Sequence, residues 1–274
     1  MAINYATKYS AKVDERFKLG SLVSGIINKD YEFTGVKTVK VYSIDTAPMN
    51  DYQRSGLARY GEALDLGDTV QELTMTQDRA FTFVIDKGDE LEQAGAKNAG
   101  AALRRQIDEV VIPEYDKYVI GKIVAGAGKT ETGAITNANA YEAFLAGAEQ
   151  LDENKVPAGG RVALVTPAYL KKLKLDDAFV KNADLGQQIV LTGQVGAVDG
   201  TPIIKVPTSY FPANVEFVIT HPVATTAPVK IEEYKIHQDP VGVSGALAEG
   251  RFLYDGFVLN NKKSAIYVHK SAGG

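Results

Sequence analysis

Apolar and polar residues alternate in three segments of the first third of the chain. Residues 36–44, 73–76 and 81–85 each place apolar side chains at every second position. A period of two puts successive side chains on opposite faces of a sheet, so each segment is predicted to be a strand with one buried face. The apolar positions are Val39, Val41, Leu73, Met75, Phe81, Phe83 and Ile85.

Residues 47–72, between these strands, contain three glycines and follow no sustained period. Loops longer than about 15 residues are uncommon in compact domains and usually have a function or are disordered. We therefore expect a functional loop that docks on a partner.

A long helix is predicted from Asp89 to Val124, because apolar residues recur there at helical spacing. Gly95 and Gly100 weaken its first turns, and Pro113 is expected to kink it. At about 1.5 Å per residue the helix would reach roughly 50 Å, which is longer than a compact domain needs and suggests a spine. Its apolar positions include Leu103, Ile107, Val110, Val111, Tyr118, Val119 and Ile123.

Four carboxylates crowd the start of this helix. Helix N-termini favour such side chains, which cap free N–H groups and interact with the positive end of the helix dipole. A metal or acid–base site is the alternative, which is less favoured because no histidine or cysteine lies nearby. These residues are Asp86, Asp89, Glu90 and Glu92.

The second half of the chain predicts a mixed α and β domain behind a Gly/Ala/Thr-rich flexible linker at residues 125–136. The expected elements are an amphipathic helix at 141–151, strands at 161–165, 203–206 and 215–219, a helix from Pro167 to Phe179, and closing strands at 229–236, 252–259 and 265–268. Asp199-Gly200 is a tight hairpin signal between residues 195–198 and 203–206. A loop is expected around residues 239–242.

Composition narrows the function. The 274 residues are 45% hydrophobic and 23% charged, which is typical of a globular protein. The net charge of −4 does not indicate a broadly basic nucleic-acid surface, so contact with DNA should be loose and local. No apolar run resembles a signal-peptide core or a membrane span, so we expect a cytosolic protein without membrane contact. The absence of cysteine excludes disulfides and thiolate chemistry.

Three candidate motifs for chemistry fail on spacing. Residues 126–130 (GAGKT) resemble the end of a P-loop, but the first glycine of that motif would fall on Ile123. The three histidines lie far apart and form no zinc motif. Gly242-Val-Ser-Gly is followed by Ala246, one residue out of register with a nucleophile elbow, although a dispersed Ser/His/Asp triad stays open. The glycines of residues 193–200 also lack the dinucleotide spacing.

Basic and aromatic residues in and beside the long loop suggest a binding surface. Arg54, Arg59 and Arg79, with Tyr52 and Tyr60, would suit stacking on single-stranded nucleic acid. A solvated or intersubunit salt-bridging face is favoured instead, because four acidic residues offset these charges. They are Asp51, Glu62, Asp65 and Asp68.

The order of these elements resembles the phage major capsid proteins of the Hong Kong 97 type over nearly the whole chain. The segments that carry the resemblance are DRAFTFVIDKGDELEQ, LRRQIDEVVIPEYDKYVIGKI, LTGQVGAVDGTPIIKVP and GRFLYDGFVLNNKKSAIYVHK. It implies an α+β fold of the Hong Kong 97 capsid type and a structural subunit with no catalytic residues, no cofactor and no metal.

The resemblance also implies a division of the chain. Residues 1–30 would be an N-terminal arm, and 31–136 a peripheral domain with an extended loop at 47–82 and a spine helix at 86–124. Residues 137–226 would be an axial domain, and 227–274 strands that return to both domains. Expected intersubunit contacts are the loop residues above and the turn with Asp239 and Pro240, which would lie near threefold contacts.

The implied partners are further copies of the chain, in pentamers and hexamers, with a portal, possible decoration proteins and packaged double-stranded DNA. A separate scaffolding protein is expected because the chain starts directly at the arm. Assembly would occur in the host cytoplasm and the product would be the virion. Some relatives cross-link their shells through an extended-loop lysine, but residues 47–82 contain no lysine. The alternatives are an encapsulin-like nanocompartment shell protein and, more remotely, a cytosolic enzyme.

Overall fold

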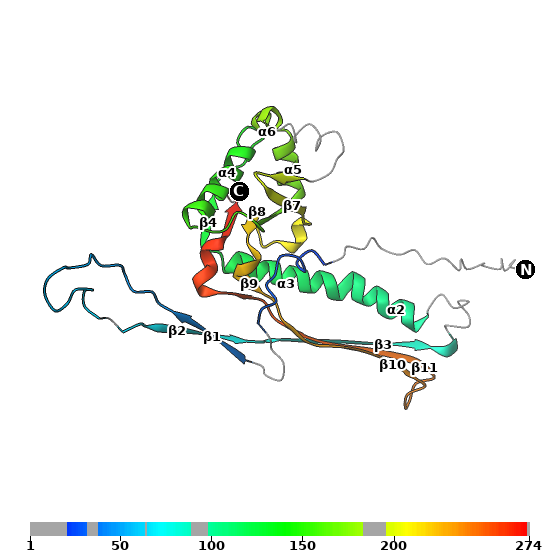
Figure 1. The fold of residues 1–274 in the computed structure, drawn as a ribbon. Helices are drawn as coiled ribbons and strands as arrows, with labels where there is room; N and C mark the ends of the chain where they lie inside the picture. Colours follow the sequence, from blue (N-terminus) through cyan, green and yellow to red (C-terminus); the bar gives the residue numbers. More distant parts are fainter. Residues whose placement is uncertain (1–20, 32–37, 64, 89–97, 183–195, 273–274) are drawn as a thin grey trace, which may run out of the picture.

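The structure is a computed structural model that describes residues 21–31, 38–63, 65–88, 98–182 and 196–272. Figure 1 shows a compact part built on a six-stranded sheet, standing on a long helix and a flat three-stranded sheet. A two-stranded ribbon projects sideways from the junction of these parts (Figure 1). Of the predicted arm at residues 1–30, residues 1–20 lie outside the described residues and residues 21–30 are described.

The projecting ribbon consists of β1 (Thr38–Ile44) and β2 (Asp68–Thr74), which pair antiparallel. Val39 and Val41 turn toward the body of the protein, where they pack against a small cluster that contains the fully buried Leu73 and Met75. The alternation seen in the sequence therefore fixes which face of the ribbon is inside. The chain between the two strands is the long loop that the sequence predicted, but its predicted end at residue 72 is wrong, because β2 begins at Asp68.

The flat sheet has the order β10-β11-β3, formed by Val229–Gln238, Gly245–Tyr254 and Gln77–Asp86. All neighbours are antiparallel. The sequence placed the start of the middle strand at Phe252, which is wrong by seven residues. Within the missed part, Gly250 has no room for a side chain because Phe81 and Tyr234 pack over it: a Cβ there would lie 2.4 Å from the Phe81 ring. Ala246 packs in a separate cluster with Ile85 and Ala99.

The spine helix runs through α2 (Ala99–Gln106), a π-helical turn η1 (Ile107–Val111) and α3 (Ile112–Ala125). This change of hydrogen bonding lies directly before Pro113, which has no N–H to donate back along the helix, and the kink expected at Pro113 stays a prediction. Asn98 caps α2 by accepting from the Gly100 and Ala101 N–H groups. The acidic residues expected at the helix start, Asp89, Glu90 and Glu92, lie outside the described residues.

The core lies where α3 meets the six-stranded sheet. Val119, Ile120 and Ile123 are fully buried there, and Val23 and Ile26 from the last part of the predicted arm pack into the same cluster. Burial of each such side chain contributes about 1.5–3 kcal/mol of hydrophobic free energy. The spine helix is thus fixed along its second half.

The six-stranded sheet has the order β4-β13-β8-β5-β7-β6. Two helices pack on it through a second cluster that includes Phe144, Tyr169 and Phe217. The strands are Lys129–Thr132, Ile266–Lys270, Val215–Thr220, Val162–Val165, Thr201–Lys205 and Ala197–Val198, and the helices are α4 (Ala140–Glu153), α5 (Pro167–Lys174) and the short α6 (Asp177–Asn182). The mixed α and β prediction and the Asp199-Gly200 hairpin are confirmed.

Short elements close the structure. The predicted strand at residues 252–259 is wrong as one unit: it is the end of β11 followed by β12 (Phe257–Val258), which pairs with β9 (Thr225–Thr226). Single 3₁₀ turns are η2 (Thr208–Tyr210), η3 (Pro222–Ala224) and η4 (Asn260–Ala265).

The predicted flexible linker at residues 125–136 is also wrong, since it contains β4, paired in parallel with β13. Gly126 and Gly128 are packed closely: a Cβ on Gly128 would lie 2.5 Å from the Lys263 carbonyl oxygen. The glycines of the P-loop-like sequence are therefore required by packing against η4 and β12.

Candidate intersubunit surfaces

The tip of the extended loop forms a small structure of its own. The Gln53 N–H donates to the Arg59 carbonyl at 2.9 Å, which continues the register of the ribbon toward Gly56. The Tyr52 and Tyr60 rings meet edge to face with centroids 5.1 Å apart. The structure thus brings together the two tyrosines that the sequence singled out.

Large apolar side chains on this loop are exposed to solvent. Met49 and Leu57 are fully exposed, and Tyr60 is 84% exposed. The outer face of the ribbon adds Tyr42, Ile44 and Val70. Contiguous exposed apolar surface on a folded protein marks an interaction site, so this loop is the main candidate interface among the described residues.

The two loop arginines differ from Arg79 in their surroundings. Arg59 donates through Nε to the Gly56 carbonyl at 3.1 Å, and Arg54 is exposed at the same tip. Arg79 lies instead on β3, with its guanidinium 3.4 Å from the Glu114 carboxylate of α3. The cluster suggested by the sequence is therefore divided between two sites.

Arg79 borders a groove of about 970 Å³ along the spine helix. The groove runs between β3, α3 and η2, and is lined by the exposed Val110 and by Tyr118, Tyr210 and the buried Phe211. Burial raises the pKa of Tyr210 and of Tyr254 at its wall.

The turn with Asp239 and Pro240 joins β10 to β11 at the far end of the flat sheet (Figure 1). Asp239 has φ +44° and accepts a hydrogen bond from the Gly245 N–H through Oδ1 at 3.0 Å. Val241 at the tip is fully exposed. The turn is a second projecting surface, well separated from the extended loop.

A buried carboxylate anchors the base of the extended loop. Asp255, 1% exposed, accepts hydrogen bonds from Tyr118 Oη, from Gly256 N and from both the N–H and the hydroxyl of Thr76, each at 2.8 Å. The Lys122 ammonium lies 3.9 Å away. These contacts join β3, α3 and β11 at one point, and sequence periodicity gave no signal for them.

A second buried carboxylate holds the start of the described chain. Asp116 of α3 accepts from the Ser21 hydroxyl at 2.8 Å and from the Leu22 N–H at 2.7 Å. Burial raises the pKa of Asp116 above its usual value, against the lowering effect of these donors. The described part of the predicted arm is therefore fixed at Ser21 and Leu22 to the spine helix of its own chain.

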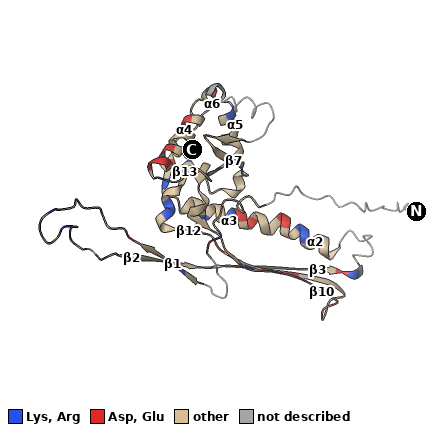
Figure 2. Ribbon diagram, viewed as in Figure 1, with Lys and Arg blue, Asp and Glu red and all other residues tan. Residues whose placement is uncertain are grey.

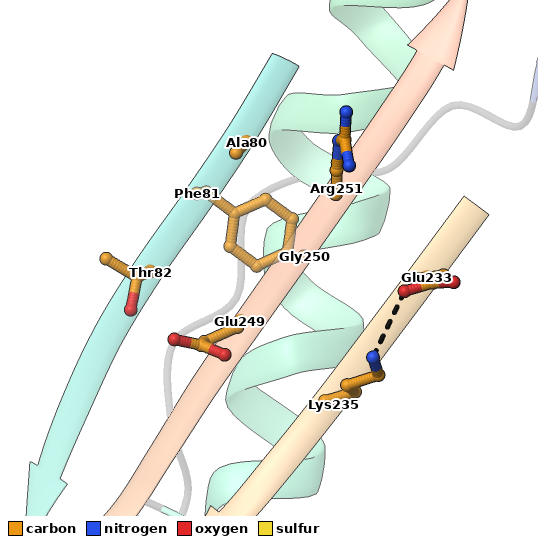
Figure 3. Close-up of a pocket in the computed structure, with 8 residues that line it drawn as sticks. All are labelled: Ala80, Phe81, Thr82, Glu233, Lys235, Glu249, Gly250 and Arg251. Atoms are coloured by element: carbon orange, nitrogen blue, oxygen red, sulfur yellow. Dashed lines mark hydrogen bonds and ion pairs between the residues drawn. The ribbon is translucent and has the colours of Figure 1, made fainter. Parts of the chain in front are cut away.

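A shallow pocket of about 430 Å³ on the flat sheet is lined by Glu233, Lys235, Glu249 and Arg251 (Figure 3). The charges form neighbouring ion pairs: Lys235 with Glu233 at 3.1 Å, and Arg251 with Asp78 at 2.6 Å. Within the described ranges, no three histidine, aspartate or glutamate side chains gather in a way that could hold a metal ion.

Acidic and basic residues are both present along the spine helix from α2 through η1 to α3 (Figure 2), which does not provide the single-sign surface that nucleic acid favours. Across the described part of the chain, no helix is both long and apolar enough to cross a lipid bilayer.

Solved structures with the same architecture come from bacteriophages. The chain superposes on a chain from Mycobacterium phage Che8 with a TM-score of 0.81 at 19% identity, covering 98% of each chain. It superposes on the capsid structure of the cyanophage P-SCSP1u with a TM-score of 0.79 at 13% identity, covering 98% of this chain and 94% of that one.

A third match is the asymmetric unit of the bacteriophage PhiM1 mature capsid, with a TM-score of 0.75 at 14% identity, covering 99% and 93% of the two chains. No family model and no curated protein matches the sequence. The chain therefore has the fold of phage capsid structures. The α+β capsid fold predicted from the sequence is confirmed, and the Hong Kong 97 type is consistent with it.

Proposed function

We propose that this chain is a major capsid protein of a tailed phage, a structural subunit without catalytic activity that builds an icosahedral head. The observation that carries the proposal is the capsid fold itself, which matches over nearly the full length of both chains in each comparison. Because fold alone does not determine function, the surfaces of this chain must also fit assembly.

The extended loop supports that requirement. It projects from the body and exposes Met49, Leu57 and Tyr60, so a single copy in water carries unburied apolar area. Contact with a neighbouring subunit would cover it. A subunit with a projecting donor surface on one side and receiving surfaces on the others can form closed rings through heterologous contacts.

In the proposed shell, subunits form pentamers and hexamers around double-stranded DNA. Residues 1–30 would serve as an arm, 47–82 as the extended loop over a neighbour, 86–124 as the spine of the peripheral domain, and 137–226 as the axial domain at the ring centres. The turn at Asp239 and Pro240 and the loop residues Tyr52, Arg54, Arg59 and Tyr60 would be intersubunit contacts, as would Arg79.

The remaining partners follow from the same proposal: a separate scaffolding protein, a portal, possible decoration proteins, and loose contact with packaged DNA. Assembly would take place in the host cytoplasm. Because residues 47–82 contain no lysine, extended-loop isopeptide cross-links are excluded and noncovalent contacts would hold the shell. An encapsulin-like compartment shares the architecture, but the structures matched above come from phages, which favours the phage head.

Sedimentation of the expressed full chain tests the proposal. The parent, with and without phage scaffolding protein, is expected to sediment as closed particles visible by negative-stain microscopy. A variant with residues 46–66 replaced by Asn-Gly, which keeps Asp45 opposite Gly67, should keep its circular dichroism spectrum and remain small. A parent that stays monomeric in all these conditions would refute the proposed function.

A further inference from the structure

β3 is an outer strand of the flat sheet, and one of its edges is open among the described residues. The Lys87 N–H donates to the Ser244 carbonyl at 3.0 Å, and these two residues lie opposite each other when the strand register is extended. Bonded and non-bonded pairs alternate in antiparallel strands, so odd-numbered residues of β3 bond to β11. The backbone N–H and C=O groups of the even-numbered residues therefore point outward.

The middle of this edge, from Ala80 to Val84, lacks the charged residues, prolines and bulges that normally prevent strand addition, and the charged residues of β3 lie toward its two ends. The side chains of its outward-bonding residues Ala80, Thr82 and Val84 are small or β-branched and exposed. Figure 3 shows Ala80 and Thr82 on this outer strand beside β11. The opposite edge, β10, has a register shift between Val229 and Ile231 and several charged residues. Of the two edges, β3 is the one built to receive a strand.

β1 presents a second open edge, on the ribbon. The Asp45 N–H donates to the Gly67 carbonyl at 2.9 Å, and these residues are opposite when the register is extended. Odd-numbered residues of β1 therefore bond to β2, and Lys40, Tyr42 and Ile44 direct their backbone groups outward. Tyr42 is 65% exposed and Ile44 is 70% exposed, so the same residues carry uncovered apolar side chains.

We propose that β1 of one copy adds antiparallel to β3 of a second copy, with Lys40 opposite Asp86, Tyr42 opposite Val84 and Ile44 opposite Thr82. The two ribbon strands and the three sheet strands then form one intermolecular five-stranded sheet. This inference rests on the proposed shell function, and it specifies how the extended loop binds its neighbour: through main-chain hydrogen bonds at a defined register.

The side chains agree with this register. Lys40 meets a carboxylate, the Tyr42 ring meets the β-branched Val84, which is 50% exposed, and Ile44 meets Thr82. Opposite-charge, aromatic–β-branched and paired β-branched contacts are the cross-strand pairs that stabilise antiparallel sheets. All six side chains lie on the exposed faces of their own strands. In the joined sheet, the buried face of the ribbon and the buried face of the flat sheet therefore lie on the same side.

The β1 strand that pairs with the β3 edge must come from a second copy of the chain and not from the same chain. β2 continues through residues 75–76 into β3, so the ribbon and the flat sheet extend in opposite directions (Figure 1), and β1 cannot reach residues 82–86 of its own chain. Pairing of β3 with β3 of another copy about Thr82 would place Asp78 opposite Asp86, and like charges directly opposite are destabilising.

Disulfide trapping tests the register, because the chain has no cysteine of its own. In the variant Tyr42→Cys/Val84→Cys, the paired Cα atoms would be about 5.5 Å apart, within the range for a disulfide. The matched control, Tyr42→Cys/Ala80→Cys, moves the second cysteine four residues along β3, roughly 14 Å at 3.4 Å per residue. Oxidised particles of the first variant should give a ladder of covalent multimers on a non-reducing gel, and the control should not.

Equal cross-linking of the two variants in intact particles would overturn the inference while leaving the proposed function in place. A parent that never assembles would overturn both.

An independent pair of variants removes the hydrogen bond without a cysteine: Thr82→Pro deletes an outward N–H and keeps the β11 bonds, and Thr82→Ala keeps the N–H. Thr82→Pro should fold by circular dichroism and lose most particles, whereas Thr82→Ala should assemble like the parent. Parental assembly of Thr82→Pro would also overturn the pairing.

Discussion

The Tyr118 hydroxyl donates a hydrogen bond to the buried Asp255 carboxylate at 2.8 Å, across 137 residues of sequence. This contact links the spine helix to the strand that follows the extended loop, because Asp255 also accepts two hydrogen bonds from Thr76. The direction in which the loop leaves the body is thus fixed by a carboxylate and three donor residues, with Gly256 as the third.

Replacing Asp255 should destabilise the subunit strongly. Asp255→Ala leaves the buried donors of Thr76 and Tyr118 without an acceptor, which is expected to cost about 3 kcal/mol of unfolding free energy. Tyr118→Phe removes a single donor and should cost about 1–2 kcal/mol. Urea unfolding of unassembled subunits measures both values. Equal, small effects of the two substitutions would show that the carboxylate is not the shared acceptor.

Asp116 should give the subunit a pH-dependent stability. Burial raises the pKa of Asp116 in the folded protein above the 3.8 of an ordinary aspartate, so the folded state holds this proton to higher pH than the unfolded chain does. Unfolding free energy contributed by this group therefore decreases as pH rises from 3.8 through the raised pKa. In urea titrations, the unfolding free energy of the parent minus that of Asp116→Asn should decrease as pH rises over this window. A difference that grows instead would contradict the assignment.

His269 should act in the opposite direction, as a source of acid sensitivity. Burial lowers its pKa below 6.5; Glu131 and Glu216 oppose this and Lys172 adds to it. Its ring stacks on Phe217 at 5.3 Å, and its buried Nδ1 has no hydrogen-bond partner. Because the unfolded chain binds the proton more readily, stability is lost as pH falls below 6.5.

The variant His269→Phe keeps the ring stack and removes the titrating group. Its unfolding free energy should fall less than that of the parent between pH 6.5 and pH 5. The matched control is His237→Gln on the exposed flat sheet, which should retain the parental acid sensitivity. If the control rather than His269→Phe removed that sensitivity, the exposed ion pair with Glu249 would be its source.

Two glycine substitutions should change stability with opposite signs. A Cβ on Gly128 would lie 2.5 Å from the Lys263 backbone, so Gly128→Ala should cost about 2 kcal/mol through forced displacement of η4. Gly121 lies inside α3 with open space around it, so Gly121→Ala should add about 0.5–1 kcal/mol through helix propensity. Thermal unfolding of the two variants compares them directly, and a tolerated Gly128→Ala would restore the view of residues 125–136 as a free linker.

Sequence periodicity predicted most of the elements that bury an apolar stripe. The alternation at Val39 and Val41 and the helical spacing through Val119 and Ile123 both correspond to buried faces. It failed for elements that form because of pairing or packing with a distant part of the chain. The strand β4 has no buried residue and exists because it pairs with β13, and Gly250 of β11 has no room for a side chain because aromatic rings from its neighbours pack over it.

The candidate contact surfaces were predicted less completely. Tyr52, Tyr60, Arg54 and Arg59 do share the loop tip, but Arg79 belongs to a different groove. The open edges of β1 and β3 were missed, because which backbone groups point outward depends on strand order and register. The sequence did contain one signal for the β1 edge. Tyr42 and Ile44 follow Lys40 on the exposed face of the strand, and two large apolar side chains are unusual on such a face.

The central claim is that this chain is a shell subunit, and cryo-electron microscopy of particles formed by the full chain tests it most directly. We predict closed icosahedral shells with rings of five and six subunits, in which the extended loop of each subunit lies against the β3 edge of its neighbour. Only monomers, or only irregular aggregates, at every protein concentration and with scaffolding protein present would contradict the claim.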